Sequence, residues 1–133
     1  MKRRYSIDFS PPAPMVPVQV SSPLGTERRL LEGKVDSGAD LCAVPEDVIG
    51  ELDVPPLRVV RAAGFDGGFR EVLLYHCELE VAGRRFPHVE ALATRRRYAI
   101  IGRNVLNALV TKLDGPKVTL TVTTPKARSR RRR

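Results

Sequence analysis

The amino-acid sequence predicts an all-β fold: a small single-domain barrel or sandwich with one or two short helices. Its 133 residues suit one domain with one core. Short segments in which apolar and polar residues alternate are typical of strands with one buried face. Turns rich in glycine and proline separate these segments at close spacing, and no internal repeat is found. These features together indicate a mostly-β core.

The chain divides into three parts. Residues 1–14 are expected to form a flexible, irregular arm, because three prolines interrupt any ladder or helix. The folded domain is expected over residues 15–124, and a basic, disordered tail over residues 125–133. Pro17 lacks a backbone donor, so the first strand of the domain is expected at an edge or a bulge.

Strands and short helices follow one another through the domain. Strands are expected over residues 16–20, 29–35, 41–44, 57–63, 69–81, 86–93, 98–101 and 117–122. Helices are expected over residues 45–49 and 103–109. Residues 64–68 are rich in glycine and predict a hairpin tip, and the three arginines at 95–97 predict an exposed loop.

The formal net charge of +8 is concentrated at the two ends of the chain. Residues 126–133 carry six basic and no acidic residues, and residues 1–10 carry a net +2, so the body between them is neutral. Such an arginine-rich end is typical of a solvated tail. The alternative is salt-sensitive attraction to nucleic acid, which is expected only through this tail.

The cysteines and histidines do not predict a metal or redox site. Cys42 and Cys77 lie among strand-like apolar residues and are expected as buried, reduced thiols; a disulfide stays open only if the fold brings them together. His76 is not expected to activate Cys77, because neighbours on a strand face opposite sides. His88 has no partner at ligand spacing. No cofactor is expected.

No apolar run is long enough to predict a transmembrane helix. The basic N-terminus is not followed by the apolar stretch of a signal peptide. The expectation is a soluble cytoplasmic protein without a membrane partner.

The loop that starts at Asp36 is the first candidate for chemistry. Val35 and Leu41 flank it with strand-like apolar residues, so a carboxylate there must find hydrogen bonds or lose its charge. Ser37 and Gly38 can supply a hydroxyl and unhindered backbone N–H groups. The same tripeptide also fits a turn that simply closes a loop, so the triplet alone leaves both interpretations open.

The Asp36 loop and two further segments resemble parts of one known family. Residues 36–40, Asp-Ser-Gly-Ala-Asp, resemble the active-site loop of the retropepsins, the retroviral-type aspartic proteases. Residues 100–106 read Ile-Ile-Gly-Arg-Asn-Val-Leu and resemble the second signature of that family. Its glycine, Gly102, follows Asp36 by 66 residues (102 − 36). The glycine-rich hairpin tip lies between them, where the family places its flap. The resemblance covers about residues 16–122.

The resemblance implies a role for each matching residue. Asp36 would be the catalytic aspartate, supported by Ser37, Gly38 and Ala39. Asp40 would bind the substrate main chain and pair with Arg103. The other expected substrate-binding residues are those of the hairpin tip and the second signature: Gly64, Phe65, Asp66, Gly67, Gly68, Ile100 and Ile101.

The chain departs from the family pattern in two places. Phe65 and Asp66 stand at a flap tip that is mostly glycine and aliphatic in retroviral enzymes. An acid there either alters pH dependence or specificity, or points into solvent. The arginine loop at 95–97 and the basic tail have no evident family counterpart.

A single catalytic loop implies two chains. The family's chemistry uses two aspartates that share one proton, and no second Asp-Ser/Thr-Gly occurs in the sequence. The implied assembly is a homodimer with one Asp36 from each chain, acting on a peptide or protein substrate. Terminal strands would interleave at its interface, with residues 16–20 and 117–122 as candidates.

Three function classes therefore stand. The first is an aspartic endopeptidase that hydrolyses peptide bonds with water activated by the paired Asp36 carboxyls. The second is a noncatalytic dimeric peptide-binding module that keeps the fold, since a fold does not secure an activity. The third is a basic protein associated with nucleic acid.

Overall fold

The computed structural model of the chain describes residues 1–64 and 66–126. It contains ten strands and two short helices in those residues. The strands are β1 (Lys2–Arg4), β2 (Met15–Ser21), β3 (Arg28–Val35), β4 (Cys42–Pro45), β5 (Pro56–Ala63), β6 (Phe69–Val81), β7 (Arg84–Thr94), β8 (Ala99–Ile101), β9 (Val110–Asp114) and β10 (Thr119–Thr123). The helices are α1 (Glu46–Glu51) and α2 (Arg103–Leu106). The expected all-β class with two short helices is confirmed.

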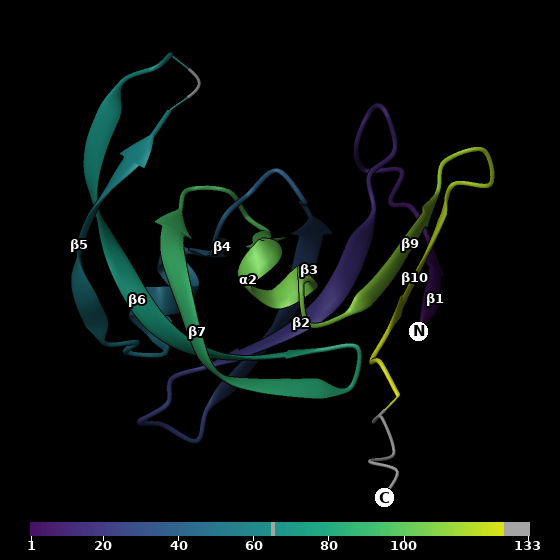
Figure 1. The fold of residues 1–133 in the computed structure, drawn as a ribbon. Helices are drawn as coiled ribbons and strands as arrows, with labels where there is room; N and C mark the ends of the chain where they lie inside the picture. The colour runs from purple at the N-terminus through teal and green to yellow at the C-terminus, as the bar shows by residue number, and fades with distance from the viewer. Residues whose placement is uncertain (65, 127–133) are drawn as a thin grey trace, which may run out of the picture.

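The main sheet has seven strands in the order β2-β3-β8-β4-β7-β6-β5. An additional antiparallel pairing joins β2 to β6, with Val18 opposite Val81 and Ser21 opposite Glu78. The pairing closes six of the strands into a barrel and leaves β5 outside the ring, paired only with β6. In Figure 1 the hairpin of β5 and β6 therefore extends away from the barrel wall.

Strand β2 shows why the barrel has a well-defined inner face. Val16, Val18 and Val20 are at most 1% exposed, whereas Pro17 between them is exposed. This is the period of two expected for a strand with one buried side. Pairing with β6 begins only at Val18, so Pro17 lies where the ladder needs no donor from it.

A second, three-stranded sheet has the order β1-β10-β9. Arg3 of β1 is opposite Leu120 of β10, so the prediction of an irregular arm for residues 1–14 is wrong at residues 2–4. Strand β9 was not predicted; Leu113 and Val110 in it are about half exposed, and its apolar residues do not alternate strictly. The two terminal segments of the described chain thus lie side by side (Figure 1).

The strands that the sequence analysis expects at a dimer interface are both paired within the chain. Residues 16–20 lie in β2, which has β3 on one side and β6 on the other over most of its length. Residues 119–122 lie in β10, the central strand of the small sheet. Both strands already have neighbours within the chain, and which strands would meet a second chain stays a prediction.

The helices are short because the chain turns directly into the next strand. Helix α1 begins after Pro45 and has Glu46 and Asp47 in its first turn, as expected near a helix N-terminus. Helix α2 ends at Leu106, three residues before the predicted end. The amide of Leu109 donates to the carbonyl of Leu106 (3.0 Å) and closes a four-residue turn that leads into β9.

Candidate active site

Asp36 follows immediately after β3, and its position is fixed through the backbone. Its amide donates to the carbonyl of Ile101 in β8 (3.1 Å), and its own carbonyl accepts from the amide of Ala39 (3.2 Å). Its carboxylate oxygen Oδ1 accepts from the amide of Gly38 (2.9 Å). The Asp36 side chain is therefore oriented by its own loop, with the residue half-buried while Ser37 and Gly38 are exposed.

The second signature holds this loop from the side. The amide of Arg103 donates to the carbonyl of Ala39 (2.8 Å) and its guanidinium donates to the carbonyl of Ser37 (2.8 Å). The same guanidinium forms an ion pair with Asp40, the partner that the family resemblance implied. One side chain thus connects helix α2 to two points of the Asp36 loop.

Gly102 allows the two segments to approach closely. A Cβ atom at this position would lie 2.5 Å from both the carbonyl carbon and the oxygen of Leu41. These are backbone atoms, which cannot move aside as a flexible side chain could. Glycine is therefore required by the close approach of two backbones.

Two residues of this crossing were not found from the sequence. Asn104 accepts a hydrogen bond from the amide of Cys42 (3.0 Å) and donates to the carbonyl of Glu90 (2.9 Å), so it joins β4 to β7. The sulfur of Cys42 accepts from the amide of Gly102 (3.3 Å). The only sequence signal was the position of Asn104 within the second signature.

Both cysteines are buried and free, as the sequence predicted. Burial raises the pKa of Cys42 from 9.0 to about 11, against a smaller lowering by the hydrogen bond from Gly102. Burial likewise raises the pKa of Cys77 from 9.0 to about 12. Neither thiol is a nucleophile at neutral pH, because only the thiolate reacts.

A cavity of about 520 Å³ lies beside the Asp36 loop. Gly38, Ala39, Asp40 and Leu41 form one wall. Strands β5, β6 and β7 form the others, through Arg58, Val60, Arg61, Ala62, Ala63, Phe69, Leu74, Glu90 and Leu92. The residues after Asp36 and the projecting hairpin, from Leu74 up to Ala63 and Phe69 beside its tip, therefore border one open, mixed polar and apolar space.

The expected substrate-binding residues divide into two groups. Asp40 lines the cavity, as do the loop residues Gly38 and Ala39. Ile101 is fully buried in the core and faces away from solvent, and Ile100 of β8 is not among the cavity residues. The described glycines of the hairpin tip do not line it either, although the adjacent Ala63 and Phe69 do.

The hairpin tip is held by a local turn. Gly64 donates to the carbonyl of Gly68 (2.9 Å), and Gly67 has a φ of 76°, which favours glycine. The carboxylate of Asp66 accepts from the amide of Gly68 (2.9 Å) and the residue is exposed. Asp66 therefore stabilises the turn. Phe65 lies outside the described residues.

His88 has a side-chain neighbour that the sequence analysis did not predict. Its Nδ1 atom lies 3.0 Å from Nε2 of His76, and the two rings stack with centroids 5.1 Å apart. The partners are twelve residues apart on the neighbouring strands β6 and β7, a proximity that only the strand pairing creates. Among the described residues, no three His, Cys, Asp or Glu side chains are placed to hold a metal ion.

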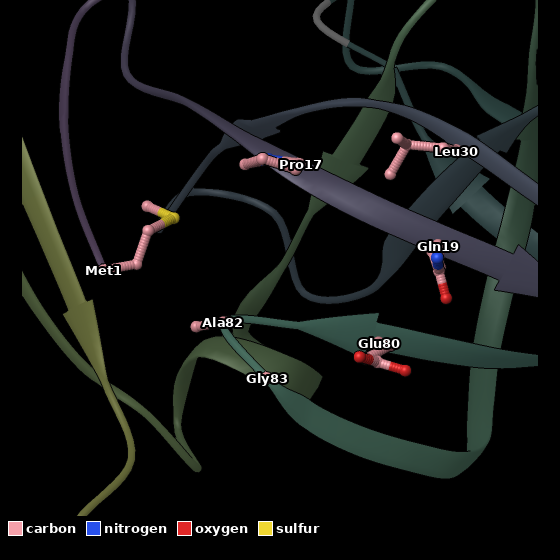
Figure 2. Close-up of a pocket in the computed structure, with 7 residues that line it drawn as sticks. All are labelled: Met1, Pro17, Gln19, Leu30, Glu80, Ala82 and Gly83. Atoms are coloured by element: carbon pink, nitrogen blue, oxygen red, sulfur yellow. The ribbon is translucent and has the colours of Figure 1, made fainter.

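A second cavity, of about 290 Å³, lies near the N-terminus (Figure 2). Its lining comes from Met1, from strands β2, β3 and β6, and from the turn between β6 and β7. Glu80 is its one titratable side chain, beside Gln19 and otherwise apolar or backbone groups. None of the residues that resemble the family's two signatures lines this cavity, so it is not the candidate active site.

None of the helices in the described part of the chain has the length and apolar character needed to cross a membrane.

Comparison with solved structures identifies the fold. A retropepsin-like aspartic protease from Rickettsia conorii superposes with a TM-score of 0.60 and 12% identity, over 92% of this chain and 88% of that chain. The EIAV protease complexed with the inhibitor HBY-793 gives a TM-score of 0.56 and 19% identity, over 79% and 92%. The simian foamy virus (mac) protease gives 0.54 and 22%, over 71% and 92%.

No protein-family model matches the sequence, and a search of curated proteins finds no match. The superpositions on solved structures nevertheless show that the chain has the fold of the retropepsin-like aspartic proteases. The sequence resemblance is confirmed at the level of that fold.

Proposed function

We propose that the protein is an aspartic endopeptidase that becomes active as a homodimer. The observation that carries the proposal is the Asp36 loop. Its carboxylate is oriented by the amide of Gly38, Arg103 holds the loop through the carbonyl of Ser37, and the loop lies beside a cavity of about 520 Å³. The retropepsin-like fold supports it, because the loop occurs in the family's order of segments.

The chemistry requires two carboxyl groups. One takes a proton from water while the other, protonated, donates a proton toward the scissile carbonyl. Two carboxyls about 3 Å apart cannot both ionise cheaply, so they share one proton and titrate as a pair. Water is then the nucleophile, and Asp36 of each chain would supply one carboxyl.

The exposure of the loop supports a partner chain at that point. Ser37 and Gly38 are exposed in the single chain, and the side chain of Asp40 is 83% exposed. A pair of carboxylates that must share a proton functions best with water excluded, since low dielectric strengthens their coupling. A two-fold axis through the Asp36 loops would cover these residues in both copies.

The substrate would lie extended in the cavity. Within the described residues, β5 is an edge strand that pairs with β6 alone, so its outer backbone groups could bind an extended peptide. The projecting hairpin would move over the peptide and exclude water.

The decisive test is cleavage of an unbiased peptide library by the wild-type protein and by Asp36→Asn. We expect kcat/KM to fall by at least about 10³ in the variant, because acid–base catalysis is removed, while the far-UV circular dichroism and the unfolding midpoint change little. Cleavage that survives the substitution would refute the mechanism.

A matched control is Asp53→Asn, an exposed carboxylate just after helix α1 that does not line the cavity, for which we expect less than a twofold change. Specific activity should also fall on dilution as dimers separate, with analytical ultracentrifugation at the same concentrations. A noncatalytic peptide-binding module would bind peptides without cleaving them, and pepstatin would leave it unaffected.

A further inference from the structure

The two histidines of the chain lie where the projecting hairpin leaves the barrel (Figure 1), and the proposed hydrolysis does not use them. Strand β6 pairs with β5 as far as Tyr75 and with β7 from Leu74 onwards. His76 is therefore the first residue of β6 beyond the β5 ladder, and its amide donates to the carbonyl of Pro55, just before β5 (3.3 Å). A change at His76 or at its partner His88 acts at the base of the hairpin.

The contact between the two rings limits how many protons the pair can hold. Nε2 of His76 and Nδ1 of His88 are 3.0 Å apart, which is the length of a hydrogen bond between two nitrogens. One nitrogen must donate and the other accept, and a protonated imidazole has no acceptor. Protonation of both rings therefore removes the bond and places two like charges side by side. Because histidine gains its charge between about pH 8 and pH 5, the contact is lost towards the acid end of that range.

Glu90 is the carboxylate that faces the pair from β7. It lies directly opposite His76 in the ladder of β6 and β7, so the two side chains are on the same face of the sheet. Its partner in the structure is Arg58 of β5, at 3.3 Å. This ion pair passes over β6 and joins the edge strand β5 to the barrel strand β7. Both side chains are about half exposed, so the pair is readily exchanged for another.

The other charged neighbours favour Glu90 as the group that receives a protonated His76. Glu78 lies two residues along β6, but it is engaged by Arg85 of β7 and its side chain is only 17% exposed. The carboxylate of Glu90 is more open, at 41%. The backbone carbonyl of Glu90 is held by the side-chain amide of Asn104 (2.9 Å), so the carboxylate can change partner while the strand stays in place.

We propose that His76 and His88 form a pH-sensitive switch at the base of the hairpin. At neutral pH the two rings are hydrogen bonded and Glu90 stays with Arg58. In acid both rings are protonated, His76 pairs with Glu90, and Arg58 no longer joins β5 to β7. Strand β5 is then held by its ladder to β6 alone and opens more readily, which admits a peptide to the cavity that it borders. The opening of β5 does not depend on hydrolysis, so the inference goes beyond the proposed function.

Amide hydrogen exchange of the full-length protein tests the switch, because the protection of an amide reports how often its strand opens. The measurement is made at about pH 7.5 and about pH 5.0, either side of the histidine range, and is corrected for the intrinsic effect of pH on exchange. We expect the protection of the β5 amides to fall by at least about threefold at the lower pH. The amides of β2, where Val18 and Val20 are fully buried, are the internal control and should keep their protection.

Three variants assign the response to these side chains. His76→Gln cannot gain a proton, so β5 should stay protected at both pH values. His76→Lys carries a charge at both, and Glu90→Gln loses the partner of Arg58, so each should show the lower protection throughout. The matched control is Glu78→Gln, which breaks the ion pair with Arg85 instead and should keep the pH response. Equal protection of β5 at the two pH values in the wild type, or a response that survives His76→Gln, would overturn the inference.

Peptide cleavage separates this inference from the proposed function. If KM falls in acid for the wild type and not for His76→Gln, the opening of β5 controls entry to the cavity. If no peptide is cut while the protection of β5 still depends on pH through His76, the proposed hydrolysis fails and the switch stands. If peptides are cut but the protection of β5 does not change with pH, the function stands and the switch is wrong.

Discussion

The Asp36 loop and the hairpin of β5 and β6 face the same cavity, but they are held in opposite ways. The loop is fixed by close backbone contacts from Gly102 and Arg103, and the side-chain oxygen of Asn104 accepts from the amide of Cys42, where the next strand begins. In the hairpin, the described residues between Pro55 and Leu74 are all exposed or half-buried, and β5 pairs only with β6. In the proposed enzyme, the catalytic carboxylate would therefore lie on a segment fixed by its neighbours, and the substrate would contact a hairpin with few buried residues.

Adjacent leucines mark the boundary between the two regions. Leu74 is fully buried and Leu73 is 45% exposed. Leu74→Ala should lower the free energy of unfolding by about 3 kcal/mol, because it removes buried methyl groups and leaves a cavity. Leu73→Ala should lower it by about 0.5 kcal/mol or less. Urea unfolding of both variants measures this, and equal losses would show that the hairpin is as tightly packed as the barrel.

Gly102 tests the rigid side. Gly102→Ala would press a methyl group against the backbone of Leu41, so we expect a loss of about 2 kcal/mol or more of unfolding free energy and of most activity. Gly50→Ala in α1 is the control, since a Cβ there meets no atom within 4 Å. It should be neutral or stabilising by up to about 1 kcal/mol, because alanine is the better helix former. A stable Gly102→Ala variant would contradict the close approach.

The buried thiols make the barrel sensitive to high pH. Burial raises the pKa of Cys77 from 9.0 to about 12, so the thiol stays neutral in the folded protein while it ionises in the unfolded chain. The stabilising difference is fully present below pH 9 and is lost as the pH rises from about 9 towards 12. At pH 10 each thiol should cost roughly 1.4 kcal/mol.

The measurement is the difference in unfolding free energy between pH 7 and pH 10, for the wild type and for Cys77→Ala. The variant should lose less on going to pH 10 than the wild type. The same loss in both proteins would assign the pH dependence to other groups.

The smallest effect on stability is expected at Asp40. Its ion pair with Arg103 is exposed, with side-chain exposures of 83% and 43%, so Asp40→Asn should change the unfolding free energy by less than about 1 kcal/mol. Because Asp40 lines the cavity, KM for peptides should rise more than kcat falls. Arg103→Lys also loses the contact to the carbonyl of Ser37, so we expect it to lower kcat/KM more than Asp40→Asn does.

Much of the fold could be predicted from local patterns, and the errors have a common cause. The alternation of Val16, Val18 and Val20 predicted a strand with one buried face, and the structure has it. Strand β1 was missed because its partner, β10, is more than a hundred residues away along the chain. Three residues of such a strand carry no pattern of their own.

The site shows the same limit. The Asp36 and Gly102 segments were identified as a pair because each has a distinctive local sequence. The contact of Asn104 with Cys42, the pairing of His76 with His88 and the burial of Ile101 depend on strand register. A register between distant strands is set by tertiary packing, and a single sequence does not display it.

The location of the thiols simplifies site-specific labelling. The N-terminal ammonium group of Met1 donates a hydrogen bond to the carbonyl of Val122 (2.9 Å). A fluorophore attached to that group would therefore disturb the small sheet. Leu24, in the turn between β2 and β3, is 83% exposed. A cysteine introduced there would react with maleimide at neutral pH while Cys42 and Cys77 stay shielded, giving a reporter far from the cavity without removing either native thiol.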